Sequence, residues 1–224
     1  MVYLDTAQHK LVSDAVGSAE RETSGEIVPV LADRSDGYTD VALWWAIGLS
    51  FTVMSILAAV PTALVGMLDT FSGGWIHEWS DGEKLAALLG IGLAVFALAL
   101  LAQLIQPLKF ALVPAPIRSA RTREAAIRHF KVGADRRTHG RTGVLLYVSM
   151  REHRAEIVAD ESIAEQVDAE VWGEAMADML GEIREGRLAE GLAAGIRDVG
   201  VVLAQHFPRE AHDKNELPDR LIEV

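Results

Sequence analysis

Two long runs without a charged residue dominate the pattern of hydrophobic and polar positions. The first covers residues 41–68 and the second covers residues 85–108. Each run exceeds the roughly 20 residues that a helix needs to cross the hydrocarbon core of a bilayer. A water-soluble protein of 224 residues could not bury two such segments on all sides. The pattern therefore predicts two transmembrane helices, the first of them kinked at Pro61.

Tryptophan residues mark both ends of the first predicted span. Trp44 and Trp45 lie at its start, and Trp75 and Trp79 lie in the loop 69–84 that joins the two runs. The amphipathic indole ring favours the headgroup level of a membrane. These positions support a transmembrane hairpin.

The distribution of Lys and Arg predicts the orientation of the hairpin. The loop between the runs carries Lys84 alone. The flanks on the other side carry seven basic residues, namely Arg21, Arg34, Lys109, Arg118, Arg121, Arg123 and Arg128. Because basic residues collect on the cytoplasmic side, we expect both termini in the cytoplasm and the loop 69–84 outside. The spans hold no ionisable group, which argues against a proton relay or an ion path.

Before the hairpin, the pattern predicts one helix and one strand. One helix face collects the apolar residues Leu11, Val12, Ala15, Val16 and Ala19. We expect Gly25 to end this helix in a left-handed cap. A strand over 27–32 follows, and Pro29, which lacks an amide donor, predicts a sheet edge or a bulge. One helix and one strand cannot bury enough apolar surface to fold alone.

After the hairpin, the pattern predicts the missing partners. "GVLLYVS" from Gly143 and "AEIVAD" from Ala155 are typical of two strands joined by a charged turn. A helix follows, with Asp168 as its N-cap and Gly186 as its stop, and a last helix spans 188–206. We therefore expect an α/β sandwich whose strand at Ile27 pairs in one sheet with the strand at Leu145. Its parts are 1–40, the hairpin 41–108, the segment 109–208 and a tail 209–224.

The order of these segments resembles the TPM-domain family. The resemblance rests on "SGEIVPVLAD", "RTGVLLYVSMREHRAEIVAD" and "DAEVWGEAMADMLGEIREGRLAEGLAAGI". The tail "NELPDRLIEV" resembles small bacterial membrane-embedded members. The resemblance implies a three-layer α/β/α sandwich, here split by the inserted two-helix hairpin. It implies either an acid phosphatase, as described for plant members, or an auxiliary factor for a membrane complex.

An acidic loop after the second strand is the candidate metal site. It contains Asp160, Glu161 and Asp168, whose carboxylate oxygens suit Ca2+ or Mg2+. The alternative is a solvated loop that leads into a helix N-terminus, where negative charge is favourable. The resemblance implies an Asp-Asn pair and a Gly-x-Gly turn at such a site, whereas this chain has Arg141-Thr142 and Ala159 there. We therefore favour the solvated loop over a metal-dependent phosphatase.

Other catalytic chemistry has little support in the sequence. The chain has no cysteine, and it lacks the common hydrolase, NTPase, dehydrogenase and zincin motifs. His139 and His153 lie among basic residues and are expected at the surface. The first 25 residues lack the pattern of a secretory signal, so we expect the N-terminus to stay in the compartment where it is made.

A basic segment follows the second predicted span. Residues 109–141 hold nine Lys or Arg against Glu124 and Asp135, within a chain of net charge -11. Its candidate ligands for lipid headgroups are Lys109, Arg118, Arg121, Arg123 and Arg128. Such a segment is attracted to anionic lipids by about 1 kcal/mol per cation. No aromatic platform interleaves with these charges, which argues against nucleic acid as a partner.

Together these features predict a module anchored in the bacterial inner membrane and facing the cytoplasm. We expect a non-enzymatic accessory or assembly factor that contacts the lipid bilayer and either another membrane protein or a second copy through the hairpin. The alternatives are a phosphatase that depends on a divalent metal and a pore formed by several hairpins. The absence of polar stripes on the spans argues against the pore.

Overall fold

The computed structural model describes residues 3–72, 78–133, 142–209 and 218–224. The chain divides into two compact units. The first unit joins Met1–Asp36 to Ala115–Val224, and the second is the inserted segment Gly37–Pro114. Each unit is described by itself.

A four-stranded mixed sheet forms the centre of the first unit, in the order β3-β2-β1-β4. Its strands are β1 (Glu26–Ala32), β2 (Gly143–Ser149), β3 (Arg154–Ala159) and β4 (Ile222–Glu223). β1 is parallel to both β2 and β4, and β2 is antiparallel to β3. Val28 lies opposite Leu145, so the segments before and after the hairpin share one sheet, as the sequence predicts.

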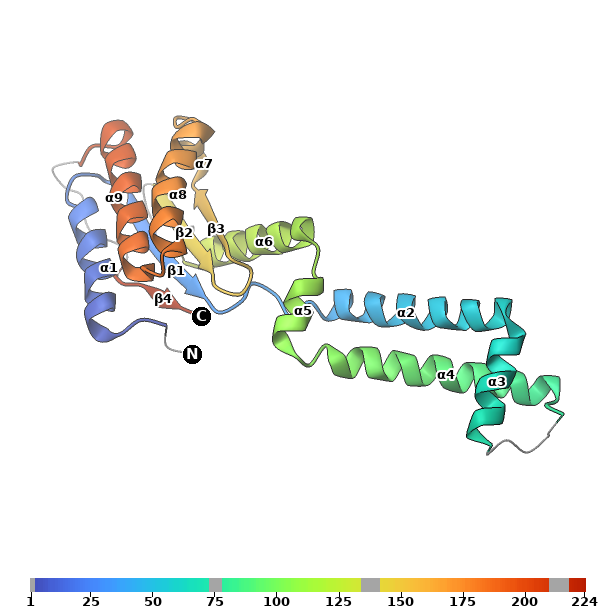
Figure 1. Cartoon of the computed structure of the whole chain (residues 1–224). Helices are drawn as coiled ribbons and strands as arrows, with labels where there is room; N and C mark the ends of the chain where they lie inside the picture. The colour runs from blue at the N-terminus through green and yellow to red at the C-terminus, as the bar shows by residue number, and fades with distance from the viewer. Residues whose placement is uncertain (1–2, 73–77, 134–141, 210–217) are drawn as a thin grey trace. The chain divides into compact units, whose positions relative to one another are not determined.

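Helices cover both faces of this sheet, as Figure 1 shows. The helices of the first unit are α1 (Thr6–Ala19), α6 (Ala115–Gly133), α7 (Glu161–Ala164), α8 (Ala169–Arg184) and α9 (Leu188–His206). Leu146 packs into the core formed with α1, α8 and α9, whereas Leu145 and Tyr147 pack on the other face against Ala126 of α6. Alternate side chains of a strand point to opposite faces, and β2 is apolar throughout because both faces are covered. The three-layer α/β/α sandwich is thereby confirmed.

β1 is an interior strand, so the prediction that Pro29 places it at a sheet edge is wrong. The physical reason lies in the direction of the backbone groups. Glu26 N donates to Thr142 O on the β2 side, so the groups of Ile27, Pro29 and Leu31 face the β4 side. The short β4 pairs with Val30 and Leu31 only. Pro29 therefore lies where no strand covers that side of β1, and its missing amide leaves no bond unmade.

Gly25 does not end α1, which corrects the predicted left-handed cap. α1 ends at Ala19, followed by Glu20 in the right-handed helical region. A Cβ atom at Gly25 would lie 2.9 Å from Cδ1 of the buried Leu203, so glycine permits close packing here. Gly186 does adopt a positive φ of 83° and follows α8, as predicted for a helix stop.

The inserted unit is helical. It contains α2 (Thr39–Ala59), α3 (Pro61–Phe71), α4 (Asp81–Ala102) and α5 (Gln106–Leu112). α2 has 21 residues and α4 has 22, and both are long and apolar enough to cross a membrane. At 1.5 Å per residue they measure roughly 32 and 33 Å. The first apolar run breaks at Val60, where φ is -126°, and Pro61 begins a new helix.

α2 and α4 pack side by side through small and polar residues. Ser50 Oγ donates to Gly92 O at 2.8 Å, and Gln103 Nε2 donates to Ala42 O at 3.0 Å. A Cβ atom at Gly92 would lie 2.3 Å from Sδ of Met54, so the helices approach closely there. Small residues and interhelical hydrogen bonds are typical of packed transmembrane helices.

Candidate functional site

The predicted metal ligands Asp160, Glu161 and Asp168 follow β3. Asp160 is 6 % exposed, and its Oδ2 accepts a hydrogen bond of 2.8 Å from the amide of Gly143 at the start of β2. Glu161 is exposed in the short helix α7, and Asp168 is the exposed N-cap residue of α8. Among the residues that the structure describes, no three His, Asp or Glu side chains are grouped to hold a metal ion. Asp160 thus joins two strand ends, and metal binding at this loop stays a prediction.

The two histidines considered from the sequence lie in different situations. His153 is exposed in the turn between β2 and β3, where its φ is 49°. His139 and Arg141 lie outside the described residues, as does Trp75. Thr142, which stands where the resemblance implies an asparagine, donates from Oγ1 to Ser24 O at 3.0 Å.

The candidate lipid ligands of the first unit lie along α6. Two of them are paired within the unit: Arg121 contacts Asp36 at 3.2 Å, and Arg123 contacts Glu156 at 3.3 Å. Arg118 is partly buried, and Arg128 is exposed. Within the described part of the chain, neither Arg118 nor Arg128 forms an ion pair with a carboxylate. Lys109 lies in α5 of the inserted unit.

A polar cluster at the other end of the sheet was not predicted. Glu152 is 1 % exposed, and its Oε1 accepts a hydrogen bond of 3.0 Å from Ser35 N while its Oε2 accepts one from Ser149 Oγ. Ser35 Oγ also lies 3.2 Å from Tyr147 OH. Burial raises the pKa of Tyr147. These bonds fix the end of the chain segment that leaves β1 for the inserted unit.

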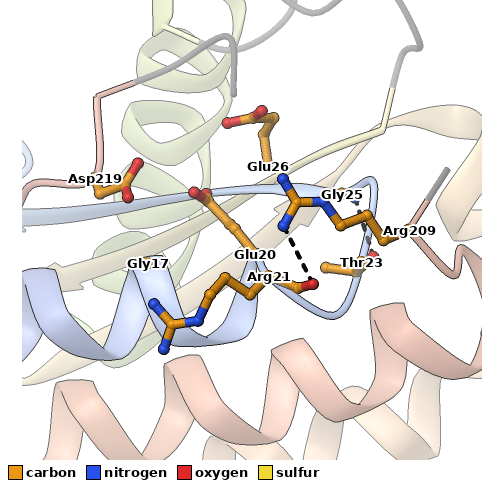
Figure 2. A pocket seen from close by; sticks show the side chains of 8 residues that line it. All are labelled: Gly17, Glu20, Arg21, Thr23, Gly25, Glu26, Arg209 and Asp219. Atoms are coloured by element: carbon orange, nitrogen blue, oxygen red, sulfur yellow. Dashed lines mark hydrogen bonds between the residues drawn. The ribbon is translucent and has the colours of Figure 1, made fainter. Parts of the chain in front are cut away.

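A separate cluster of acidic residues lines the cavity that Figure 2 shows. The cavity measures about 200 Å³ and is lined by Gly17, Glu20, Arg21, Thr23, Gly25, Glu26, Arg209 and Asp219. Three elements each contribute one carboxyl group: Glu20 follows α1, Glu26 begins β1, and Asp219 precedes β4. The two glutamates are almost fully buried, at 9 % and 6 % exposed.

Glu20 is the most perturbed carboxyl group of this cavity. Its Oε1 accepts a hydrogen bond of 2.8 Å from the amide of Ile27. Its pKa is raised to about 8, above all by burial and to a smaller extent by the neighbouring Glu26 and Asp219, against the opposing effect of the Ile27 amide. Glu20 is therefore protonated in most molecules at neutral pH.

Sequence reasoning missed this cluster because Asp219 is far from the two glutamates along the chain. Glu20 and Glu26 flank the end of one predicted helix and the start of the next strand, where acidic residues are common at surfaces. The signal that could have indicated the cluster is Asp219 in the tail "NELPDRLIEV", which stands two residues before the apolar pair Leu221 and Ile222.

Comparison with known proteins agrees with this architecture. The sequence model of the TPM domain matches residues 117–202. This segment is therefore similar to the TPM domain, in agreement with the resemblance. β1 and α1, which lie before the inserted unit, complete the sandwich around the matched segment.

One solved structure is similar over the whole chain. It is the NMR structure of BA42 protein from the psychrophilic bacterium Bizionia argentinensis, with a TM-score of 0.57 and 18 % sequence identity. The similarity covers 100 % of this chain and 97 % of that chain, and at this identity it shows the fold. No curated protein matches the sequence.

Proposed function

We propose that this protein is a membrane-anchored, non-enzymatic TPM module on the cytoplasmic face of a bacterial inner membrane. In this proposal it acts as an accessory or assembly factor for another membrane protein. The TPM domain and the two apolar helices support the general class. The particular role is inferred from how the insertion and the acidic loop are built.

The pairing of β1 with β2 carries the proposal. β1 precedes the inserted unit and β2 follows it, yet their residues pair in parallel along the full length of both strands. Two strands of one sheet must lie on the same side of a membrane. A hairpin of two spans returns the chain to that side, and the basic residues that flank it favour the cytoplasm.

The state of the acidic loop supports a non-enzymatic role. Asp160 is buried and uses its carboxylate to bind the Gly143 amide, so it contributes to the sheet and not to an open site. A catalytic Mg2+ or Ca2+ site needs several oxygen ligands that converge on one point. Glu161 and Asp168 instead lie exposed at the starts of two different helices.

The basic face of α6 supports contact with anionic lipid. Arg128 is exposed and lies in the segment that follows the hairpin directly. Arg123 is also exposed but is paired with Glu156. We expect Arg128→Gln to weaken flotation of the protein with anionic vesicles, and Arg123→Gln, its matched control, to have the smaller effect. Equal effects of the two changes would contradict this assignment.

Enzyme assays test the non-enzymatic claim. The purified full chain is incubated with a generic phosphomonoester in the presence of Mg2+ or Ca2+, beside an Asp160→Ala variant. We expect no hydrolysis above that of the variant. Hydrolysis that requires the metal and is lost in Asp160→Ala would overturn the proposal in favour of the phosphatase.

Purification from membranes tests the role as an accessory factor. The tagged protein is extracted in mild detergent, beside a variant whose segment Gly37–Pro114 is replaced by an unrelated two-span hairpin. We expect one other membrane protein to co-purify with the native chain in repeated preparations, and to be absent when the hairpin is replaced. Recovery of this chain alone, or a second copy of it, would contradict the proposal.

A further inference from the structure

The cavity of Figure 2 brings three carboxyl groups together, of which Glu20 and Glu26 are almost fully buried and Asp219 is partly buried. Glu20 uses one carboxyl oxygen to accept the Ile27 amide. Its other oxygen, Oε2, is buried, and no N–H or O–H group among the described residues is placed to donate a bond to it. The carboxyl group of Asp219 faces it from the C-terminal segment and interacts with it. Two carboxyl groups that face each other in a buried place are stable when they share one proton.

Asp219 belongs to the segment that leads into β4. In this segment Leu221 is buried in the main core. Val224 N donates to Leu31 O at 3.0 Å, and its carbonyl oxygen accepts from Asp33 N at 2.9 Å. β4 has only two residues, so this attachment is small. The contacts of Asp219 therefore matter for the docking of the whole described segment 218–224, called the tail below.

The backbone of α1 is shaped to receive Asp219. A Cβ atom at Gly17 would lie 2.9 Å from Oδ2 of Asp219. Gly17 lies less than one helical turn before Glu20. The carboxyl group of Asp219 thus lies against the last turn of α1, directly beside Glu20.

We propose that a proton shared between Glu20 and Asp219 latches the C-terminal strand to the sheet, so that docking of β4 takes up a proton. Release of the tail exposes Glu20 to water and frees the proton. It also frees Leu31 O and Asp33 N on the β4 side of β1.

The direction of the pH effect follows from the proton uptake. Glu20 has its ordinary value of 4.5 as reference in water and a pKa of about 8 with the tail docked. Below the lower value both states hold the proton, and docking has its full strength. As the pH rises between the two values, the released state loses its proton first, so docking weakens by up to about tenfold per pH unit. Above the upper value docking stays weak and constant.

Other charged groups face this pair from the surrounding elements. Glu26, from the start of β1, adds repulsion once Glu20 ionises. Arg21 and Arg209 line the cavity, and Arg209 Nη1 donates to Arg21 O at 3.3 Å. His9 of α1 lies 3.1 Å from Glu223, so it is a second titratable group in contact with β4. The test must therefore separate Glu20 from His9.

A single spin label on the tail tests the latch. The chain has no cysteine, so Val224→Cys carries the only label, and Val224 is exposed. The full chain in nanodiscs is measured from pH 5 to 9 by the line shape of the label. At low pH we expect an immobile population of the label, which corresponds to the docked tail. As the pH rises to about 8, the ratio of mobile to immobile label should increase by up to tenfold per pH unit. A Leu221→Ala background, which weakens docking at every pH, brings both populations into the measurable range.

Single substitutions show which ionisable side chain causes the pH response of the label. Glu20→Gln keeps a hydrogen on the side chain, so in the His9→Gln background we expect the tail to stay docked with no response to pH. Glu22→Gln, an exposed neighbour, and His9→Gln should keep the pH response. Asp219→Asn is the second variant, and it should reduce the response without abolishing it, because burial remains the largest cause of the raised pKa of Glu20. The proposal is overturned if the label shows no pH response in the Leu221→Ala background, if Glu20→Gln still responds when His9 is also glutamine, or if His9→Gln alone abolishes the response.

Discussion

Replacing Glu152 by alanine tests how the two parts of the first unit are held together. Glu152 follows the inserted unit, whereas its partner Ser35 precedes it. The buried carboxylate accepts one bond from Ser35 N and another from Ser149 Oγ. Glu152→Ala removes both acceptors and leaves two donors without them, Ser149 Oγ in a buried place and Ser35 N in a partly buried one.

The expected loss can be estimated from these two bonds. A hydrogen bond to a charged group contributes roughly 1.5 to 3 kcal/mol. Removal of the carboxylate also removes the cost of burying its charge, so we take the lower end for both bonds. The free energy of unfolding should therefore fall by about 3 kcal/mol. For a chain of this size, that loss lowers the melting temperature by roughly 6 to 12 °C.

The assay is denaturant unfolding of the full chain in a mild detergent, followed by circular dichroism. Glu152→Gln is the matched control, because its amide can still accept from Ser35 N and donate to Ser149 Oγ. We expect this control to lose no more than about 1 kcal/mol. If Glu152→Ala unfolds within 0.5 kcal/mol of the native chain (roughly the scatter of a surface change), or if the glutamine variant is as unstable, the reasoning is refuted.

Two further predictions each compare a glycine in close contact with one in open space. Gly25→Ala should lower the free energy of unfolding by about 1 to 3 kcal/mol in the same assay, because the added Cβ atom meets Leu203. Gly173→Ala, in open space on α8, should be neutral or stabilising, and equal effects of the two changes would contradict the close packing at Gly25. Gly92→Leu should separate α2 from α4 and lower disulfide cross-linking between single cysteines on the two helices several-fold, while Gly90→Leu, which faces open space, should not. Cross-linking that survives Gly92→Leu would show that the helices do not meet there.

The parts of the fold that depend on local pattern were predictable from the sequence. The amphipathic helices after Asp168 were predictable from their periodicity, and the apolar strand from Gly143 and the two uncharged runs from their length and lack of charge. The need of one helix and one strand for partners also predicted that the sheet joins the segments before and after the hairpin, and β1 and β2 confirm this. In each case, the signal lies within a short stretch of sequence.

The parts that depend on distant neighbours were not predictable. β4 has two residues and no pattern of its own, so its place beside β1 was missed, and with it the reason that Pro29 is tolerated in an interior strand. Gly25 was interpreted through its backbone freedom, although its contact with Leu203 decides its role. The cavity around Glu20 was missed for the same reason, because its members meet only after the sheet has formed.

Cysteine labelling of the topology tests the central claim most directly. The chain has no cysteine, so Gly37→Cys, Glu78→Cys and Val224→Cys each provide one reactive site. A thiol reagent that does not cross membranes is added to intact spheroplasts and to permeabilised ones. We predict that the site at residue 78 reacts in intact spheroplasts, and that the sites at 37 and 224 react only after permeabilisation. Labelling of 37 and 224 from opposite sides, or protection of 78 in intact spheroplasts, would contradict the split domain on the cytoplasmic face.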